Sequence, residues 1–320
     1  SVFWKRRQRE RGTMESSDYF KRKNLNLFRA LFPLKWIWAW LQAKVSQPIG
    51  NDNMAILVME GLQFGECPRI HGEHLYVSDF YEKCVYKIDI ETNELKKRID
   101  FDDTIAGTGF LPDGRMLVVG RETRCLYCYD ETTESTILYA DLKDVTRFRV
   151  NDMVLDDQGN AYVGNFGFDI AHAITNSATT TFIRVDPDRN VHVEATEIFF
   201  PNGSVITPDG KTLLLCETFM GHILAFDRDP ETGTLSNRRI WANIGTLVDG
   251  CCLDAEGCLW VAIPQVGAYK TCGCVIRVNS KGETIERYGF NRNGLKSCSI
   301  ACALATKRDG THWLYVMEAE

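Results

Sequence analysis

The sequence predicts an all-β protein, a six-bladed β-propeller, and three observations lead to this prediction. A block with a polar residue, an apolar run, an Asp-rich turn with Gly and a second β-forming run recurs along the chain. In three copies the polar residue stands eight positions before the turn Gly; these residues are Asn151, Asn202 and Asp249. The copies start 51 and 47 residues apart, a period typical of repeat folds such as propellers.

Residues 1–52 do not carry the repeat, so we expect a basic, Trp-containing extension outside the fold and a propeller over residues 53–320. The extension holds 11 Lys/Arg against 4 Asp/Glu and four of the seven tryptophans. Charged residues and Pro33 interrupt its apolar run from Leu25 to Val45, which argues against a transmembrane segment. A leader and a membrane-surface anchor are the two roles left open for it.

The remaining chain is acidic, with 26 Lys/Arg against 39 Asp/Glu, which argues against nucleic acid as a partner. None of the twelve cysteines has zinc-finger spacing. Cys125 and Cys128, for example, lie three apart in a predicted strand and therefore point to opposite faces. We expect small buried thiols in a reducing compartment, and hence a cytoplasmic protein. The oligomeric state is left open.

The blocks follow one another without helical patterns between them. The residues in the polar position of successive blocks, here called slot residues, are Glu66, Ala106, Asn151, Asn202 and Asp249. A sixth, divergent block over residues 299–316 is followed by Glu320, one or two strands short of a full blade. We therefore expect an incomplete sixth blade, closed by an early strand over Met54–Glu60.

The slot residues are expected to converge. The first strand of every blade lines the central channel in the same direction, so its slot residue reaches one common mouth. Glu66, Asn151, Asn202 and Asp249 would offer two carboxylates and two amides there. Hard divalent cations prefer such oxygen ligands, whereas the simpler alternative is hydrogen bonding to ordered water. The sequence thus predicts one divalent metal ion, with Ca²⁺ favoured over Zn²⁺, Mn²⁺ or Mg²⁺.

Two further charged residues are expected at the same mouth. Arg149 precedes Asn151 by two positions, so both side chains lie on one face of the strand. Asp169 lies on a loop between the second and third strands of the third block, longer than a hairpin needs. Such loops share the mouth with the starts of the first strands. For Asp169 the alternative is a solvated surface loop.

Four motifs occur in order, and they read Gly65-Glu66-Cys67-Pro68, Arg149-Val150-Asn151-Asp152, Phe200-Pro201-Asn202-Gly203 and Val248-Asp249-Gly250. With them the chain from about Met54 to Glu320 resembles the regucalcin/gluconolactonase family, which also includes luciferin-regenerating enzyme-like proteins. The resemblance implies a six-bladed propeller that binds one divalent metal and hydrolyses lactones of sugar acids. Cys67 and Val248 depart from the Gly and Pro that are usual there.

The resemblance also implies roles for individual residues. It implies Glu66, Asn202 and Asp249 as metal ligands. It implies that Arg149 and Asn151 contact substrate or metal. A carboxylate on the following loop binds substrate in the family, and Asp169 falls at that place.

Three functions are compatible with these residues. In a lactonase the metal would polarise the ring ester of a small-molecule substrate, Asp249 would shuttle the proton, and Arg149 and Asp169 would orient substrate hydroxyls. A phosphotriesterase-like hydrolase could use the same oxygen-ligated metal. A non-catalytic calcium- or ligand-binding propeller is the third reading. Turnover of a lactone panel with and without chelator separates them, which the fold alone cannot do.

Overall fold

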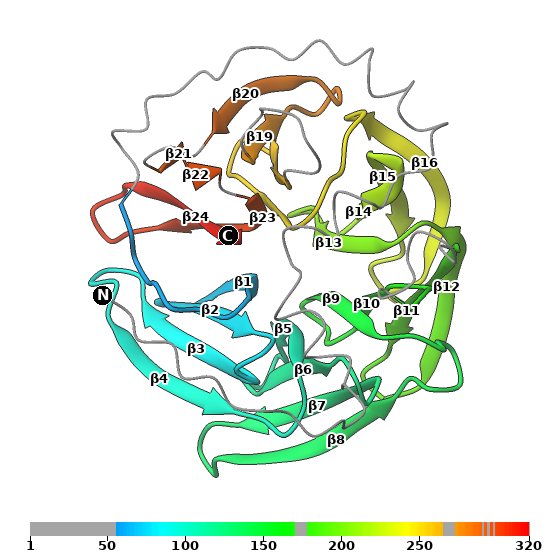
Figure 1. The fold of residues 1–320 in the computed structure, drawn as a ribbon. Helices are drawn as coiled ribbons and strands as arrows, with labels where there is room; N and C mark the ends of the chain where they lie inside the picture. Colours follow the sequence, from blue (N-terminus) through cyan, green and yellow to red (C-terminus); the bar gives the residue numbers. More distant parts are fainter. Residues whose placement is uncertain are drawn as a thin grey trace, which may run out of the picture.

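The structure is a computed structural model that describes residues 56–169, 178–264, 273–289, 291–292, 295–296 and 298–319. The predicted extension over residues 1–52 lies outside these ranges. Within them, five four-stranded antiparallel sheets stand around a common centre (Figure 1). Strands β1, β5, β9 and β13 lie near the centre, and β4, β8, β12 and β16 lie at the rim (Figure 1). The prediction of an all-β propeller is confirmed.

Each of the first three blades is a meander that runs from the centre outward. Blade one contains β1 (Gly65–His71), β2 (His74–Asp79), β3 (Cys84–Asp89) and β4 (Leu95–Asp100). Blade two contains β5 (Ile105–Phe110), β6 (Met116–Gly120), β7 (Cys125–Asp130) and β8 (Ser135–Asp141). Blade three contains β9 (Val150–Leu155), β10 (Ala161–Asn165), β11 (Thr180–Val185) and β12 (Val191–Ile198).

Two more blades repeat this order and a smaller sheet follows. Blade four contains β13 (Pro201–Ile206), β14 (Thr212–Glu217), β15 (His222–Arg228) and β16 (Leu235–Asn243). Blade five contains β17 (Cys251–Leu253), β18 (Leu259–Ile263), β19 (Cys274–Val278) and β20 (Thr284–Gly289). The short hairpin and the last sheet contain β21 (Asn291–Arg292), β22 (Leu295–Lys296), β23 (Cys298–Thr306) and β24 (His312–Ala319).

The predicted Asp-rich turns join the first two strands of each repeat. Their glycines share a positive φ of 70° to 94° and donate the backbone N–H to the carbonyl three residues earlier. The set is Gly114, Gly159, Gly210, Gly257 and Gly310. A residue with a Cβ adopts this conformation only at a cost, which explains why Gly recurs at a fixed distance from the slot residues.

The core lies between neighbouring blades rather than in one central mass. Leu117 and Leu126 of blade two pack with Met153 and Ile183 of blade three, and all four are fully buried. Similar clusters fill the space between blades one and two, three and four, and four and five. This sheet-on-sheet packing explains the near-continuous apolar runs of the inner strands.

The last sheet closes the ring against blade one. Tyr315 of β24 donates its hydroxyl to the Ile90 carbonyl at 3.3 Å, across 225 residues of sequence. The Lys307 ammonium donates to the Glu91 carbonyl at 3.2 Å. Ala303 of β23 and Tyr315 belong to one apolar cluster with Leu75 and Ile88 of blade one. The seam of the propeller is therefore made by residues far apart in the chain.

Two details of the predicted closure need correction. Within the described residues five blades are complete rather than six, because the last sheet has two strands. Residues 56–60 form no strand, whereas a strand over Met54–Glu60 was expected to pair into that sheet. Val58, Met59 and Leu62 pack on the cluster at the seam. This stretch thus contributes apolar side chains to the seam instead of ladder hydrogen bonds.

Helical structure is nearly absent from the ranges described. Thr218–Met220 form one short 3₁₀ turn (η5) directly after β14. It ends at Gly221, whose left-handed conformation brings its N–H to the Thr218 carbonyl at 3.3 Å. No helix among the described residues is long and apolar enough to cross a bilayer.

Candidate functional site

The slot residues occupy equivalent positions on the inner strands. Glu66, Ala106, Asn151 and Asn202 are each the second residue of their strands β1, β5, β9 and β13, and all four are buried. Asp249 precedes β17 by two residues and is partly buried. Because the inner strands run in the same direction, these side chains lie at one end of the channel.

A β-bulge follows the slot position in several blades. The pairing register shifts between Glu66 and Arg69 on β1, between Ile105 and Thr108 on β5, and between Pro201 and Ser204 on β13. A bulge places an extra residue on one strand and re-aims its side chains. Cys67 lies inside the first bulge with φ of 49°, a conformation that favours Gly. The sequence pattern gave no sign of these bulges.

Gly203 lets two inner strands approach closely beside the site. A Cβ on Gly203 would lie 2.7 Å from the Asp249 carbonyl oxygen and 2.7 Å from the Cys251 nitrogen. Both contacts are with backbone, which cannot rotate away. The Gly after Asn202 therefore fixes the distance between two of the predicted ligands.

We expect Gly203→Ala to lower the free energy of unfolding by about 1–3 kcal/mol, because the new methyl must push β13 and β17 apart. Divalent-cation affinity should fall as well, since Asn202 and Asp249 move relative to each other. Urea unfolding and calorimetric titration measure the two effects. Gly289→Ala is the matched control, as nothing lies within 4 Å of its Cβ position. Equal behaviour of the two variants would contradict this account.

The two slot amides contact each other directly. Asn151 Nδ2 donates to Asn202 Oδ1 at 3.1 Å, and Asn202 Nδ2 donates to Thr218 Oγ1 at 3.1 Å. This chain of hydrogen bonds orients the Asn202 amide with its oxygen on the side of Asn151. A carbonyl oxygen has a second lone pair, so Asn202 Oδ1 can still bind another partner.

The two slot carboxylates lie in an environment that disfavours negative charge. Burial raises the pKa of Glu66 to about 8, and Asp152 adds to this, while the Cys67 backbone N–H and Arg121 act against it. Burial, together with the charges of Glu66 and Asp152, raises the pKa of Asp249 well above its usual value. Asp249 Oδ1 is enclosed and accepts no hydrogen bond within the described residues.

Arg69 and Asp152 complete the surroundings, and sequence reasoning gave them no role. Arg69 Nη2 lies 3.0 Å from Asp152 Oδ1, and Arg69 Nε donates to the Thr108 carbonyl at 3.1 Å. One side chain thus ties blade one to blades two and three. Asp152 is the last residue of the second motif quoted above, and Arg69 directly follows the first motif, but neither motif indicates that the two residues meet.

Arg149 and Asp169 flank the same end of strand pair β9–β10, where the Phe166 N–H donates to the Arg149 carbonyl at 3.0 Å. Arg149 precedes β9, and its Nε lies 2.8 Å from the Glu122 carboxylate of blade two. Asp169 is exposed at the beginning of the long loop, whose residues 170–177 lie outside the described ranges. The loop over residues 264–273 of blade five also lies largely outside them.

The residues present fit a hard divalent cation. A buried carboxylate oxygen without a hydrogen-bond donor is costly unless a cation or donor meets it, and Asp249 Oδ1 is such an atom. Glu66 supplies a second carboxylate close enough to raise the pKa of Asp249. Within the described part of the chain no three His, Cys, Asp or Glu side chains form a metal site. The ligand set therefore depends on amide oxygens as well.

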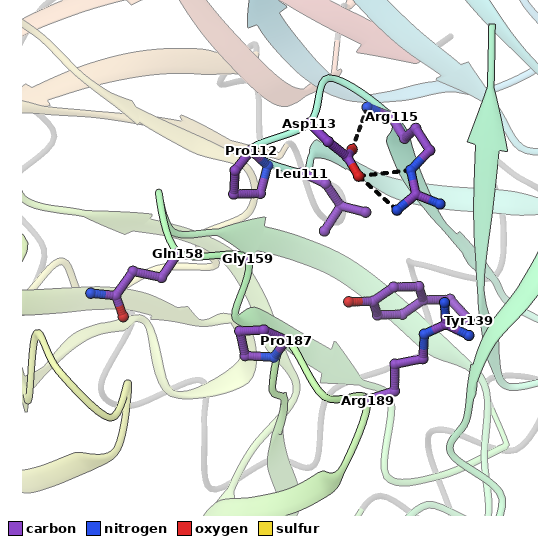
Figure 2. A pocket seen from close by; sticks show the side chains of 9 residues that line it. All are labelled: Leu111, Pro112, Asp113, Arg115, Tyr139, Gln158, Gly159, Pro187 and Arg189. Carbon is purple, nitrogen blue, oxygen red and sulfur yellow. Dashed lines mark hydrogen bonds and ion pairs between the residues drawn. The ribbon is translucent and has the colours of Figure 1, made fainter. Parts of the chain in front are cut away.

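A separate hollow lies at the other end of the inner strands. It is formed where β5 and β9 end, and Figure 2 shows Asp113, Tyr139, Gln158 and Arg189 around it. Asp113 is held by Arg115 at 2.6 Å, and Arg189 lies over the Tyr139 ring. The predicted ligands stand at the starts of these strands, so this hollow is not part of their site.

The sequence of this chain is similar to those of known proteins. The family model "SMP-30/Gluconolactonase/LRE-like region" matches residues 64–317. Human regucalcin is 26% identical over 209 residues, which cover 63% of this chain and 69% of that protein. Regucalcin of Xenopus laevis is 26% identical over 249 residues, covering 76% and 80%.

Solved structures show the same fold. A calcium-binding protein, regucalcin, from Agrobacterium tumefaciens superimposes with a TM-score of 0.64 at 19% identity, covering 82% of this chain and 92% of that one. A gluconolactonase from Xanthomonas campestris superimposes with a TM-score of 0.59 at 19% identity, covering 80% and 83%.

Proposed function

The chain belongs to the SMP-30/gluconolactonase/LRE-like family, and from this premise we propose that it hydrolyses lactones of sugar acids with one divalent cation at the channel mouth. The enclosed Asp249 Oδ1, which has no donor among the described residues, carries this proposal. The solved structures of a calcium-binding regucalcin and of a gluconolactonase, which share this fold, support it. Ca²⁺ is the proposed ion, ahead of Zn²⁺, Mn²⁺ and Mg²⁺.

In this proposal the side chains divide the work. When bound, a divalent cation polarises an ester carbonyl and lowers the pKa of water. Glu66, Asn202 and Asp249 would hold the cation through their side-chain oxygens. Asn151 orients the Asn202 amide through the hydrogen bond at 3.1 Å. Asp249 also takes the proton that the attacking water loses and returns it to the ring oxygen that leaves.

A lactone panel tests the proposal. We expect turnover of gluconolactone in the presence of Ca²⁺, loss of turnover after chelation, and recovery when the ion is added back. Turnover of phosphotriesters but not of lactones would favour the phosphotriesterase-like alternative. Ca²⁺ binding without turnover of either substrate would favour a non-catalytic binding propeller.

Arg149 and Asp169 are proposed to orient the hydroxyls of the substrate. We expect Arg149→Ala and Asp169→Ala to lower kcat/KM for polyhydroxylated lactones by roughly 10- to 100-fold, because each removes charged hydrogen bonds. Simple apolar lactones offer these groups nothing to hold and should lose less. Steady-state kinetics on both substrate types, with calorimetric measurement of cation affinity, check this.

Glu122→Gln controls for the ion pair, because it removes the partner of Arg149 and keeps the guanidinium. We expect Glu122→Gln to lose less than Arg149→Ala on polyhydroxylated lactones. Equal losses on the two substrate types for Arg149→Ala would assign Arg149 a structural role.

A cytoplasmic location is proposed on the state of the cysteines. Nine cysteines of the described ranges are free thiols, and all of these but Cys252 are buried; the set is Cys67, Cys84, Cys125, Cys128, Cys216, Cys251, Cys252, Cys258 and Cys302. Cys252 and Cys302 have sulfur atoms 3.7 Å apart without a bond between them. Free thiols at this distance are typical of a reducing compartment. Thiol titration of protein from native cells, with and without reductant, tests this.

A further inference from the structure

Arg121 is a buried, positively charged residue to which the proposed function assigns no role. Only 7% of its surface is exposed, and its Nε is enclosed without a hydrogen-bond partner. Within the described part of the chain this nitrogen therefore donates no hydrogen bond. Leaving such a group unpaired is costly, so its surroundings must compensate the charge or a ligand must do so.

Two aromatic rings provide part of the compensation. The Arg121 guanidinium carbon lies 4.1 Å from the Phe80 ring centre and 5.4 Å from the Phe166 ring centre. Phe80 belongs to blade one and Phe166 to blade three, so the side chain is held between both neighbours of its own blade. Contacts with ring faces stabilise the charge but use none of the five N–H donors of the guanidinium.

The position of Arg121 in the fold is equivalent to that of Phe80, Phe166 and Thr218. Each is the first residue after the second strand of its blade, and each donates its backbone N–H to the residue just before the inner strand. The acceptors, in blade order, are Phe64, Thr104, Arg149 and Phe200. The four side chains therefore form one layer at the mouth, next to the slot residues.

Blade four shows how close this layer is to the slots. Thr218 Oγ1 contacts Asn202 Nδ2 at 3.1 Å, so a side chain of the layer touches the slot residue of its blade. In blade two the slot holds Ala106, which offers no polar group. In blade two the polar side chain at the mouth is therefore that of Arg121, in the neighbouring layer, and not that of the slot residue.

The charge of Arg121 lies beside the candidate metal site. The Arg121 backbone N–H donates to the Thr104 carbonyl at 2.9 Å, directly before the inner strand β5, so the side chain starts from the mouth at which the slot residues lie. A divalent cation held by Glu66 and Asp249 would cancel both carboxylate charges. The positive charge of Arg121 would then no longer be balanced by these two carboxylates.

The other arginines near the mouth are already paired. Arg149 lies 2.8 Å from the Glu122 carboxylate, and Arg69 lies 3.0 Å from Asp152. Of these three arginines, only Arg121 has an enclosed Nε without a hydrogen-bond partner among the described residues. A buried guanidinium nitrogen in this situation suits an anion that arrives with the substrate. An oxyanion matches the planar donors of a guanidinium best.

We propose that Arg121 is a specificity-determining residue that binds an oxyanion on the substrate, so that the preferred lactones carry a carboxylate besides the ring ester. This rests on the proposed lactone hydrolysis and narrows its substrate class to lactones of dicarboxylic sugar acids. Asp249 transfers the proton at the ring ester, and Arg121 holds the second carboxylate of the substrate through paired N–H···O hydrogen bonds.

The test compares D-glucarolactone, which carries a carboxylate, with gluconolactone, which is neutral. We expect the wild type to prefer D-glucarolactone and Arg121→Met to lower that preference, as a ratio of kcat/KM values, by roughly 10- to 100-fold. Arg121→Lys should restore part of it. A phosphorylated gluconolactone distinguishes a carboxylate site from a general oxyanion site, because a phosphate that is equally preferred would overturn the carboxylate assignment.

Arg115→Met is the matched control, because Arg115 belongs to the same blade but follows the end of β5 that is away from its slot residue. Figure 2 shows Arg115 beside the separate hollow. Arg115→Met removes the same charge and should leave the ratio unchanged. A structural role is excluded separately, since Arg121→Met relieves an unpaired buried charge and should not lower the melting temperature. A lower melting temperature with an unchanged ratio would overturn the proposal.

A binding measurement separates this proposal from the lactonase proposal. Calorimetric titration of Ca²⁺-loaded protein with D-glucarate needs no turnover. We expect D-glucarate to bind the wild type and to bind Arg121→Met roughly 10-fold or more weakly. If no lactone is turned over but this difference persists, the oxyanion site stands and the reaction is wrong. If both proteins bind D-glucarate equally, the oxyanion site is wrong.

Discussion

Replacing Asp249 by Asn will remove both the bound divalent cation and lactone hydrolysis. The substitution keeps the shape of the side chain but removes the charge of the carboxylate whose Oδ1 is enclosed and unpaired. Loss of one partner of a buried charge interaction costs about 3 kcal/mol or more, which corresponds to roughly 100-fold or more in kcat/KM. Elemental analysis of dialysed protein and steady-state kinetics measure the two losses.

Asp209→Asn is the control for this substitution. Asp209 lies in the exposed turn of blade four and accepts hydrogen bonds from Thr207 and Lys211. It should keep both cation and activity. Retention of the full cation content by Asp249→Asn would show that the ligands lie elsewhere.

Replacing Arg228 by Met will lower the free energy of unfolding by about 3–5 kcal/mol. Arg228 of blade four forms an ion pair with Asp156 of blade three, and only 1% and 2% of the two side chains are exposed. Its Nε also donates to Tyr162 Oη at 2.9 Å. In the variant, the buried Asp156 carboxylate at the interface of two blades lacks its ion-pair partner. Urea unfolding will measure the loss of stability.

An exposed pair gives the contrast. Arg239 lies 2.6 Å from Asp227 in the same blade, with 42% and 50% of the side chains exposed. Arg239→Met should cost less than about 1 kcal/mol, because solvent screens such a pair. Arg228→Met combined with Asp156→Leu should regain part of the loss, since no unpaired charge then remains buried. Similar costs for the two single variants would refute the argument from burial.

Repeat spacing was sufficient to place the inner strands and their slot residues. Glu66, Asn151 and Asn202 are second in their strands, and Ala106 takes the same place without a polar group. This works because the distance from slot to turn Gly is set by local strand length and turn chemistry. Both are properties that neighbouring residues determine.

Contacts between distant residues were out of reach of that reasoning. Arg69 meets Asp152 across 83 residues, and Arg121 lies between Phe80 and Phe166 of two other blades. Nothing local to these residues signals the partner. The expected strand over Met54–Glu60 was wrong for a related reason, because whether a β-forming run pairs depends on the edge it meets rather than on its own composition.

The closure of the ring at Tyr315 and Ile90 determines the order in which the chain can fold. Hairpins within a blade join residues a few positions apart and need little loop-closure entropy. The contact across 225 residues costs roughly 5 kcal/mol of chain entropy before it is formed. Blades one to five are therefore expected to form early and the seam last, as a slow refolding phase. Hydrogen exchange should correspondingly report the amides of β23 and β24 as the first to open.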